Sequence, residues 1–171
     1  MIFLCFSSHD RYSIVKSCLY HLKNYGYDTW YDYHELILGD KKHEKNFVKA
    51  IQSCDYFVII YSNNLLNSPC AVNEEALIYA EAAKRDITIF PLLYNLKFSE
   101  LPFEIQDKIE NLIYNEITDD TGCIEPVNQM VVKILLDEMG YSEFEFTPSI
   151  HSFLLRKIDD NFLKAILLEY L

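Results

Sequence analysis

Short apolar runs alternate with segments of helical periodicity along most of this chain. The clearest run is the six aromatic or β-branched residues at 56–61, which the turn-prone Ser62-Asn63-Asn64 follows. Such alternation is typical of a parallel sheet with helices on both faces, joined by right-handed crossovers. We therefore predict an α/β three-layer sandwich with a five-stranded parallel sheet. The predicted strands are 2–6, 28–32, 56–61, 87–93 and 113–117, and the predicted helices are 13–25, 47–54, 71–85, 103–112 and 126–139.

The last part of the chain differs in character. Residues 142–149 are loop-like, and an apolar stripe at intervals of four then runs from Leu154 to Tyr170. We predict a main domain over 1–140 and a C-terminal helical extension over 141–171. The stripe must pack on its own domain, on a second copy or on another protein, and the sequence leaves these possibilities open.

Charge and composition exclude several classes of function. The formal net charge of −11 opposes nucleic-acid binding, which needs clustered Lys and Arg. No apolar run approaches the ~18 residues that a membrane span needs. The five cysteines are odd in number and form no C-x-x-C pair, which indicates reduced thiols and a cytoplasmic protein without a membrane partner. The histidines have no metal-ligand spacing, so we predict no metal and no bound cofactor.

Three loops should meet at one edge of the predicted sheet. In a parallel sheet the strand-to-helix loops emerge on the same side, where ligands bind. These loops cover 7–11, 33–40 and 62–75, and their hydroxyls, carboxylates and aromatic rings suit a ligand with a planar ring and sugar hydroxyls better than a metal. The sequence therefore predicts a binding site for such a ligand at this edge.

Two adjacent carboxylates, Glu74 and Glu75, stand in the last of these loops, in what we predict to be the first turn of a helix. They either complement the helix dipole or perform chemistry. An inward stripe at ~100° per residue would leave Glu75 on its flank and point Glu74 nearly opposite, which favours Glu75 as the catalytic group. The residues of that predicted stripe are Val72, Ala76, Tyr79, Ala80 and Ala83.

Over residues 1–140 the chain resembles the TIR (Toll/interleukin-1 receptor) domain family. Residues 2–10 are similar to the family's first strand and loop, 28–32 and 35–40 to its second strand and BB loop, 53–62 to its third strand, and 89–92 to its fourth. The resemblance implies a flavodoxin-like fold, in agreement with the alternation of elements. Within the family, the chain resembles bacterial stand-alone members that cleave NAD in anti-phage, Thoeris-like, defence.

In catalytic members of this family, a glutamate in a motif resembling S-x-W-C-x-x-E cleaves the nicotinamide bond of NAD. This chain lacks the Trp. Counting from Ser68 gives Glu74, whereas helical phase gives Glu75, so both stay candidates. The activity implied is that of an NAD glycohydrolase or cyclase, with NAD as substrate and an ADP-ribose-type product.

The resemblance also implies a set of substrate-binding residues and partners. Copies would associate through TIR–TIR contacts, and the product would act on a separate effector. The alternative is a non-enzymatic adaptor or virulence mimic that docks to other TIR domains, which the missing Trp supports. The substrate-binding candidates, from the three loops and the second strand, are Phe6, Ser7, Ser8, Asp10, Arg11, Trp30, Leu38, Gly39, Asp40, Ser68 and Cys70.

Overall fold

The structure, a computed structural model, describes residues 1–31, 44–138 and 140. The chain divides into two compact units, Met1–Ile124 and Glu125–Leu171, and the candidate site lies in the first. The predicted extension and the BB-loop candidates Leu38, Gly39 and Asp40 lie outside the described residues. The domain boundary at residue 140 stays a prediction.

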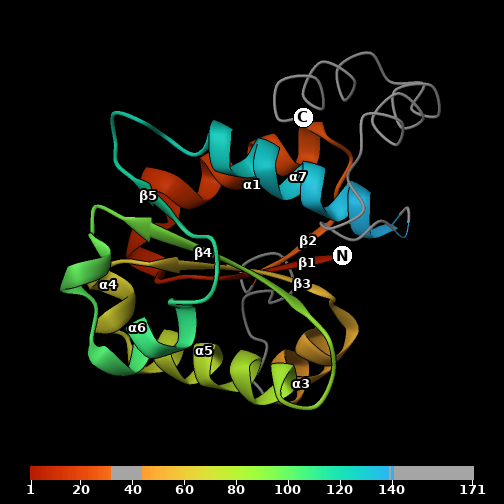
Figure 1. The fold of residues 1–171 in the computed structure, drawn as a ribbon, viewed down its shortest axis with the longest axis horizontal. Coiled ribbons are helices and arrows are strands. Elements are labelled where there is room, and N and C mark those ends of the chain that lie inside the picture. The colour runs from red at the N-terminus through yellow and green to blue at the C-terminus, as the bar shows by residue number, and fades with distance from the viewer. Residues whose placement is uncertain (32–43, 139, 141–171) are drawn as a thin grey trace, which may run out of the picture. The chain divides into compact units, whose positions relative to one another are not determined.

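Five parallel strands form the sheet of the described chain, in the order β2-β1-β3-β4-β5 (Figure 1). The central pairing aligns Cys5 of β1 with Ile59 of β3. The predicted α/β fold with a five-stranded parallel sheet is therefore confirmed. The strands are β1 Ile2–Cys5, β2 Thr29–Trp30, β3 Tyr56–Tyr61, β4 Thr88–Tyr94 and β5 Asn115–Ile117.

Helices cover both faces of this sheet, with α1 on one side and α3, α5 and α6 on the other (Figure 1). None of the helices in the described part of the chain combines the length and apolar character that crossing a bilayer requires. The helices are η1 Ser8–Asp10, η2 Arg11–Val15, α1 Lys16–Asn24, α3 Glu44–Ser53, α4 Asn63–Leu66, α5 Pro69–Ala82, η3 Phe98–Glu100, α6 Phe103–Ile109 and α7 Ile124–Glu138.

Gly26 follows the end of α1, directly after the predicted helix 13–25. Its φ of 82° lies in the left-handed region that favours glycine. The Gly26 N–H donates to the Lys23 carbonyl, and the Tyr27 N–H donates to the Leu22 carbonyl, which together form a Schellman motif. This turn directs the chain back toward β2.

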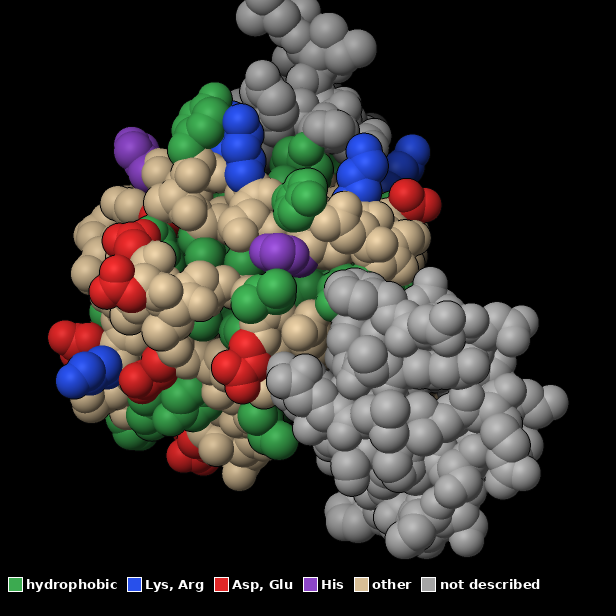
Figure 2. Space-filling model, turned by 90° about the horizontal axis from the view of Figure 1, so that it is seen from above, with side chains coloured by type: hydrophobic (Ala, Val, Ile, Leu, Met, Phe, Trp, Pro, Cys, Tyr) green, Lys and Arg blue, Asp and Glu red, His purple; other side chains and the backbone are tan. Residues whose placement is uncertain are grey.

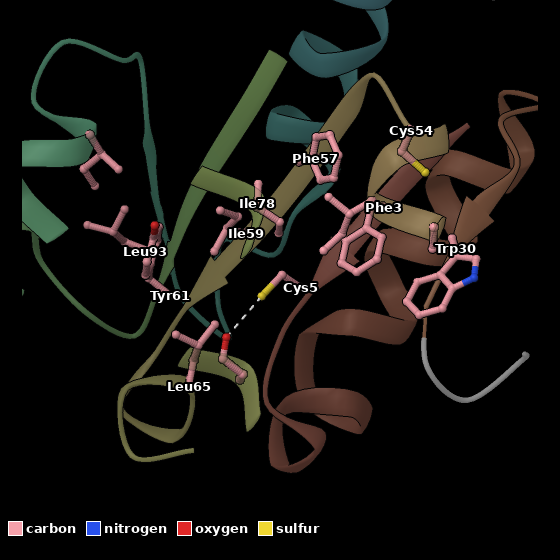
Figure 3. Packing of buried hydrophobic residues seen from close by; sticks show 14 of the residues in the cluster. Phe3, Cys5, Trp30, Cys54, Phe57, Ile59, Tyr61, Leu65, Ile78 and Leu93 are labelled. Atoms are coloured by element: carbon pink, nitrogen blue, oxygen red, sulfur yellow. Dashed lines mark hydrogen bonds between the residues drawn. The ribbon is translucent and has the colours of Figure 1, made fainter. Parts of the chain in front are cut away.

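The core on the α3 and α5 side of the sheet is rich in aromatic rings. Phe3 stacks on Trp30 with ring centroids 4.7 Å apart, and its ring centroid lies 5.7 Å from that of Phe57 (Figure 3). Phe3 and Phe57 are fully buried, and Trp30 is 8% exposed. Aromatic pairs of this kind add to the stability gained from burial alone. The short strand β2 is thus held to β1 by side-chain stacking as well as by backbone pairing.

Arg85 lies just beyond the carboxyl end of α5 and ties that end of the helix to neighbouring residues. Its guanidinium donates to the backbone carbonyls of Ile51 and Cys54 and to the carboxylates of Glu81 and Asp55. The planar guanidinium carries five donors, which suits it to several acceptors at once. Helix α5 is therefore tied to the end of α3 at its carboxyl end.

Candidate active site

The first turn of α5 is fixed against the carboxyl end of β1. The Cys5 thiol donates to the Ala71 carbonyl across 3.6 Å, the dashed line in Figure 3. Ser68 caps the helix by accepting a hydrogen bond from the Ala71 N–H at 3.4 Å, and Pro69 follows at the first helical position. The sequence thus starts α5 at the edge where ligands bind in parallel sheets.

Glu74 and Glu75 are the sixth and seventh residues of α5, which begins at Pro69. They lie in its second turn, so the prediction of the first turn was wrong. The effect of the helix dipole falls off within the first turn. A dipole explanation for these two carboxylates is correspondingly weak.

The inward face of α5 also differs from the predicted stripe. Val72 is 41% exposed, and Ala76, Ala80 and Ala83 are exposed too. The predicted phase was wrong because the helix is apolar on several sides and buries Glu75, next to the exposed Ala76 that the prediction placed inward. The residues that α5 buries are Ala71, Glu75, Ile78 and Glu81.

The Glu75 carboxylate is enclosed by donors from two other elements. Its side chain is 4% exposed, and Nζ of Lys108 on α6 lies 2.9 Å from both carboxylate oxygens. The Tyr61 hydroxyl, at the end of β3, donates to Oε1 at 3.1 Å. A buried carboxylate is tolerated when it is paired and hydrogen-bonded in this way. Glu75 is therefore bonded into the interior of the fold.

Tyr79 completes this cluster on the Lys108 side. Its ring lies 4.8 Å from the Lys108 ammonium, and its hydroxyl lies 3.3 Å from that of Tyr61. Burial, together with the nearby Glu75 charge, raises the pKa of Tyr79 to about 12. Burial, followed by the charges of Tyr79 and Glu75, also raises the pKa of Tyr61. Both phenols are kept neutral next to the carboxylate.

Alkaline pH is expected to weaken the fold at this cluster. Because the pKa of Tyr79 is raised in the fold, its contribution to stability is present below pH ~10 and is lost as pH rises toward about 12. Between pH 9 and pH 11.5 we expect the free energy of unfolding to fall by roughly 2 kcal/mol less in Tyr79→Phe than in wild type. Urea unfolding at the two pH values measures both decreases. Equal decreases in the two proteins would contradict the raised pKa of Tyr79.

Glu74 lies beside this cluster and is only half-buried. Burial of the Cys5 thiol raises its pKa, and the carboxylates of Glu74 and Glu75 raise it further. Both charges therefore act at the carboxyl end of β1. Of the two glutamates, Glu74 is the more exposed.

Asp10 joins two of the three predicted loops. It is 1% exposed, and its carboxylate accepts hydrogen bonds from Ser62 Oγ at 2.5 Å and Asn64 Nδ2 at 2.6 Å. Ser62 Oγ in turn accepts a hydrogen bond from the Leu65 N–H and caps α4. Loops 7–11 and 62–75 thus meet as predicted, whereas all of loop 33–40 lies outside the described residues.

The remaining predicted site residues differ in accessibility. Ser8 and Cys70 are exposed, and Arg11 and Ser68 are half-buried. Phe6, Ser7 and Trp30 are buried, and Ser7 also caps η1 by accepting a hydrogen bond from the His9 N–H. Among the described residues no group of three or more His, Cys, Asp or Glu side chains gathers around a possible metal position.

Sequence reasoning did not identify Tyr61, Tyr79 and Lys108 as residues of the cluster around Glu75. Tyr61 ends β3 at the same sheet edge, so the rule about strand ends could have found it. Lys108 follows Glu75 by 33 residues on another helix, and no periodicity links the two.

Comparison with known proteins identifies a family over most of the chain. The family model for the TIR domain matches residues 2–125. A curated protein of Methanobrevibacter olleyae, named "Probable 2' cyclic ADP-D-ribose synthase TcpO", is 29% identical over 100 residues, which are 58% of this chain. The match spans 29% of the length of that relative.

Solved structures support the same fold. The TIR domains of the activated Roq1 resistosome, which recognises the pathogen effector XopQ, align with a TM-score of 0.63 at 21% identity, over 78% of this chain and 98% of that one. The TIR domain of the Toll-related receptor TRR-2 from Hydra magnipapillata aligns with a TM-score of 0.56 at 15% identity, over 80% of this chain and 95% of that one. A TIR-STING receptor from C. gigas, solved in complex with 2',3'-cGAMP, aligns with a TM-score of 0.60 at 16% identity, over 76% of this chain and 38% of that one.

Proposed function

Since this chain belongs to the TIR domain family, we propose that it cleaves the bond between nicotinamide and ribose in NAD. The observation that carries the proposal is the half-buried Glu74 in the second turn of α5, beside the carboxyl end of β1. The name of the Methanobrevibacter olleyae relative, a cyclic ADP-ribose synthase, supports the same substrate.

We assign the catalytic role to Glu74 and a role in the fold to Glu75. Both oxygens of Glu75 are engaged by Lys108, and one also accepts from Tyr61, so it has little capacity left for a substrate. Glu74 is also the residue that the spacing from Ser68 selects. The helical phase that favoured Glu75 rested on an inward stripe that the structure does not contain.

The chemistry needs a single fixed carboxylate. As the C–N bond breaks, its electron pair leaves with nicotinamide and the ribose becomes oxocarbenium-like. A carboxylate aimed at this ribose stabilises the developing positive charge and accepts hydrogen bonds from ribose hydroxyls. Capture by water gives ADP-ribose, and capture by a hydroxyl of the same molecule gives a cyclic product. Each route releases one proton.

Incubation of the purified chain with NAD tests the proposal. We expect nicotinamide to appear in equal amount to the NAD consumed, with ADP-ribose or a cyclic isomer as the second product, as resolved by chromatography and mass spectrometry. The assay covers a range of protein concentrations, because we propose that copies associate through TIR–TIR contacts. Absence of nicotinamide at every concentration would overturn the proposal and favour the docking adaptor. Action of the product on a separate effector and a role in anti-phage defence stay predictions.

A further inference from the structure

The enclosed carboxylate of Glu75 lies one residue from Glu74 on the same helix. Consecutive residues of an α-helix project ~100° apart around its axis. Any group that fixes the direction of Glu75 therefore also fixes the direction of Glu74. The rotation of α5 about its own axis decides where the Glu74 carboxylate stands relative to β1.

Contacts from β3 and α6 hold Glu75 in one direction. Lys108 Nζ lies 2.9 Å from both of its oxygens, and the Tyr61 hydroxyl donates to Oε1 at 3.1 Å. Tyr79, one helical turn on from Glu75, contacts Lys108 through its ring and Tyr61 through its hydroxyl. We call Tyr61, Glu75, Tyr79 and Lys108 the Glu75 anchor.

We propose that the Glu75 anchor positions Glu74 for NAD cleavage by setting the rotation of α5, with Lys108 as its essential cation. This inference rests on the proposed function. Lys108 is a positioning residue, because it acts on the reaction through Glu75 and the helix that carries Glu74.

Removal of the Lys108 cation is expected to change the position of Glu75 and of the second turn of α5. Without Lys108, Tyr61 would be the one donor to the Glu75 carboxylate among the residues that the structure describes. A buried carboxylate without its cation is strongly unfavourable, and Glu75 can regain water only if the second turn of α5 rotates or unwinds. Either movement displaces Glu74 from the end of β1.

Three variants separate positioning from catalysis by Glu75 itself. Lys108→Met removes the cation and keeps an unbranched stem of similar length. Lys108→Arg keeps a cation that can pair with the carboxylate. The double variant Glu75→Leu/Lys108→Met removes both charges and lets apolar packing hold the helix. If Glu75 were the catalytic group, the double variant would be inactive.

Lys84→Met is the matched control. Lys84 is also joined to a glutamate of α5, with its Nζ 3.5 Å from Glu81, but its side chain is 68% exposed. The chemical change is the same as in Lys108→Met, but the lysine that it removes is exposed, and Glu81 keeps its hydrogen bond from Arg85. We expect its kcat to stay within twofold of wild type.

The experiment measures kcat and KM for nicotinamide release per folded molecule, with the folded fraction read from thermal unfolding. We expect Lys108→Met to lower kcat at least tenfold with KM changed less than threefold, and both Lys108→Arg and the double variant to recover most of the loss. Unchanged kcat in Lys108→Met, or an inactive double variant that folds, would overturn the inference. If Lys108→Met fails to fold, the double variant and Lys108→Arg decide.

The inference can fail separately from the proposed function. If wild type releases no nicotinamide, the proposed function fails, and amide hydrogen exchange of the second turn of α5 still tests the anchor. We expect exchange there to become at least tenfold faster in Lys108→Met and to be unchanged in Lys84→Met. Equal exchange in both variants would overturn the inference.

Discussion

Replacing Glu74 by glutamine is expected to lower kcat for nicotinamide release by about a hundredfold to a thousandfold, with a smaller change in KM. The substitution keeps the size of the side chain and removes the negative charge that opposes the positive charge growing on the ribose. Loss of one preorganised electrostatic contact typically costs this much in kcat. An effect on kcat with little effect on KM identifies an interaction made in the transition state. Steady-state kinetics of nicotinamide release measures both parameters.

Glu75→Gln and Glu104→Gln complete this comparison. Glutamine at 75 can still accept hydrogen bonds from Tyr61 and Lys108, so we expect measurable turnover. Glu104 is exposed near the start of α6, and its replacement should leave kcat within twofold of wild type. Loss of turnover in Glu75→Gln with normal turnover in Glu74→Gln would return the catalytic role to Glu75.

Asp10→Ala is expected to lower the free energy of unfolding by about 3 kcal/mol, since hydrogen bonds to a charged group contribute ~1.5–3 kcal/mol each. The buried carboxylate accepts from Ser62 and Asn64, and its removal leaves the buried Ser62 hydroxyl without that acceptor. The same change loosens the turn into α4 and the start of α5. Urea denaturation followed by circular dichroism measures the loss.

Asp55→Ala serves as the control for Asp10→Ala. Asp55 is 71% exposed on its side chain and pairs with Arg85 at the surface. Exposed pairs contribute ~0–1 kcal/mol, so its effect should be much smaller. A loss below 1 kcal/mol in Asp10→Ala would show that Ser62 and Asn64 find other partners. Unchanged KM for NAD in folded Asp10→Ala is expected if Asp10 organises the loops without touching the substrate.

The strands were predictable because a parallel sheet buried on both faces requires continuous apolar runs. The run at 56–61 coincides with β3, and the predicted helix 13–25 ends within one residue of the end of α1 at Asn24. Helix α4 was not predicted, because four residues are too few to show a periodicity. Within the described part of the strand predicted at 28–32, β2 covers Thr29 and Trp30, since aromatic content marks burial more directly than backbone pairing.

The site was harder to predict than the fold, for a specific reason at α5. Hydrophobic periodicity assumes that the inward face is apolar, and here a glutamate occupies it. The cation that allows this burial comes from α6 and is invisible to any local pattern. The meeting of loops 7–11 and 62–75 was predictable from the parallel topology alone, but the hydrogen bonds through Asp10 that join them were not.

The pairing of the buried Glu75 carboxylate with the half-buried Lys108 also constrains how this chain can change by mutation. Removing one partner of a fully buried pair costs about 3–5 kcal/mol, and a somewhat smaller cost here is still a large share of the ~5–15 kcal/mol that keeps a domain folded. Replacing both with apolar residues can cost nothing. A substitution at either position alone is therefore expected to destabilise the fold, whereas substitutions at both positions together can be tolerated.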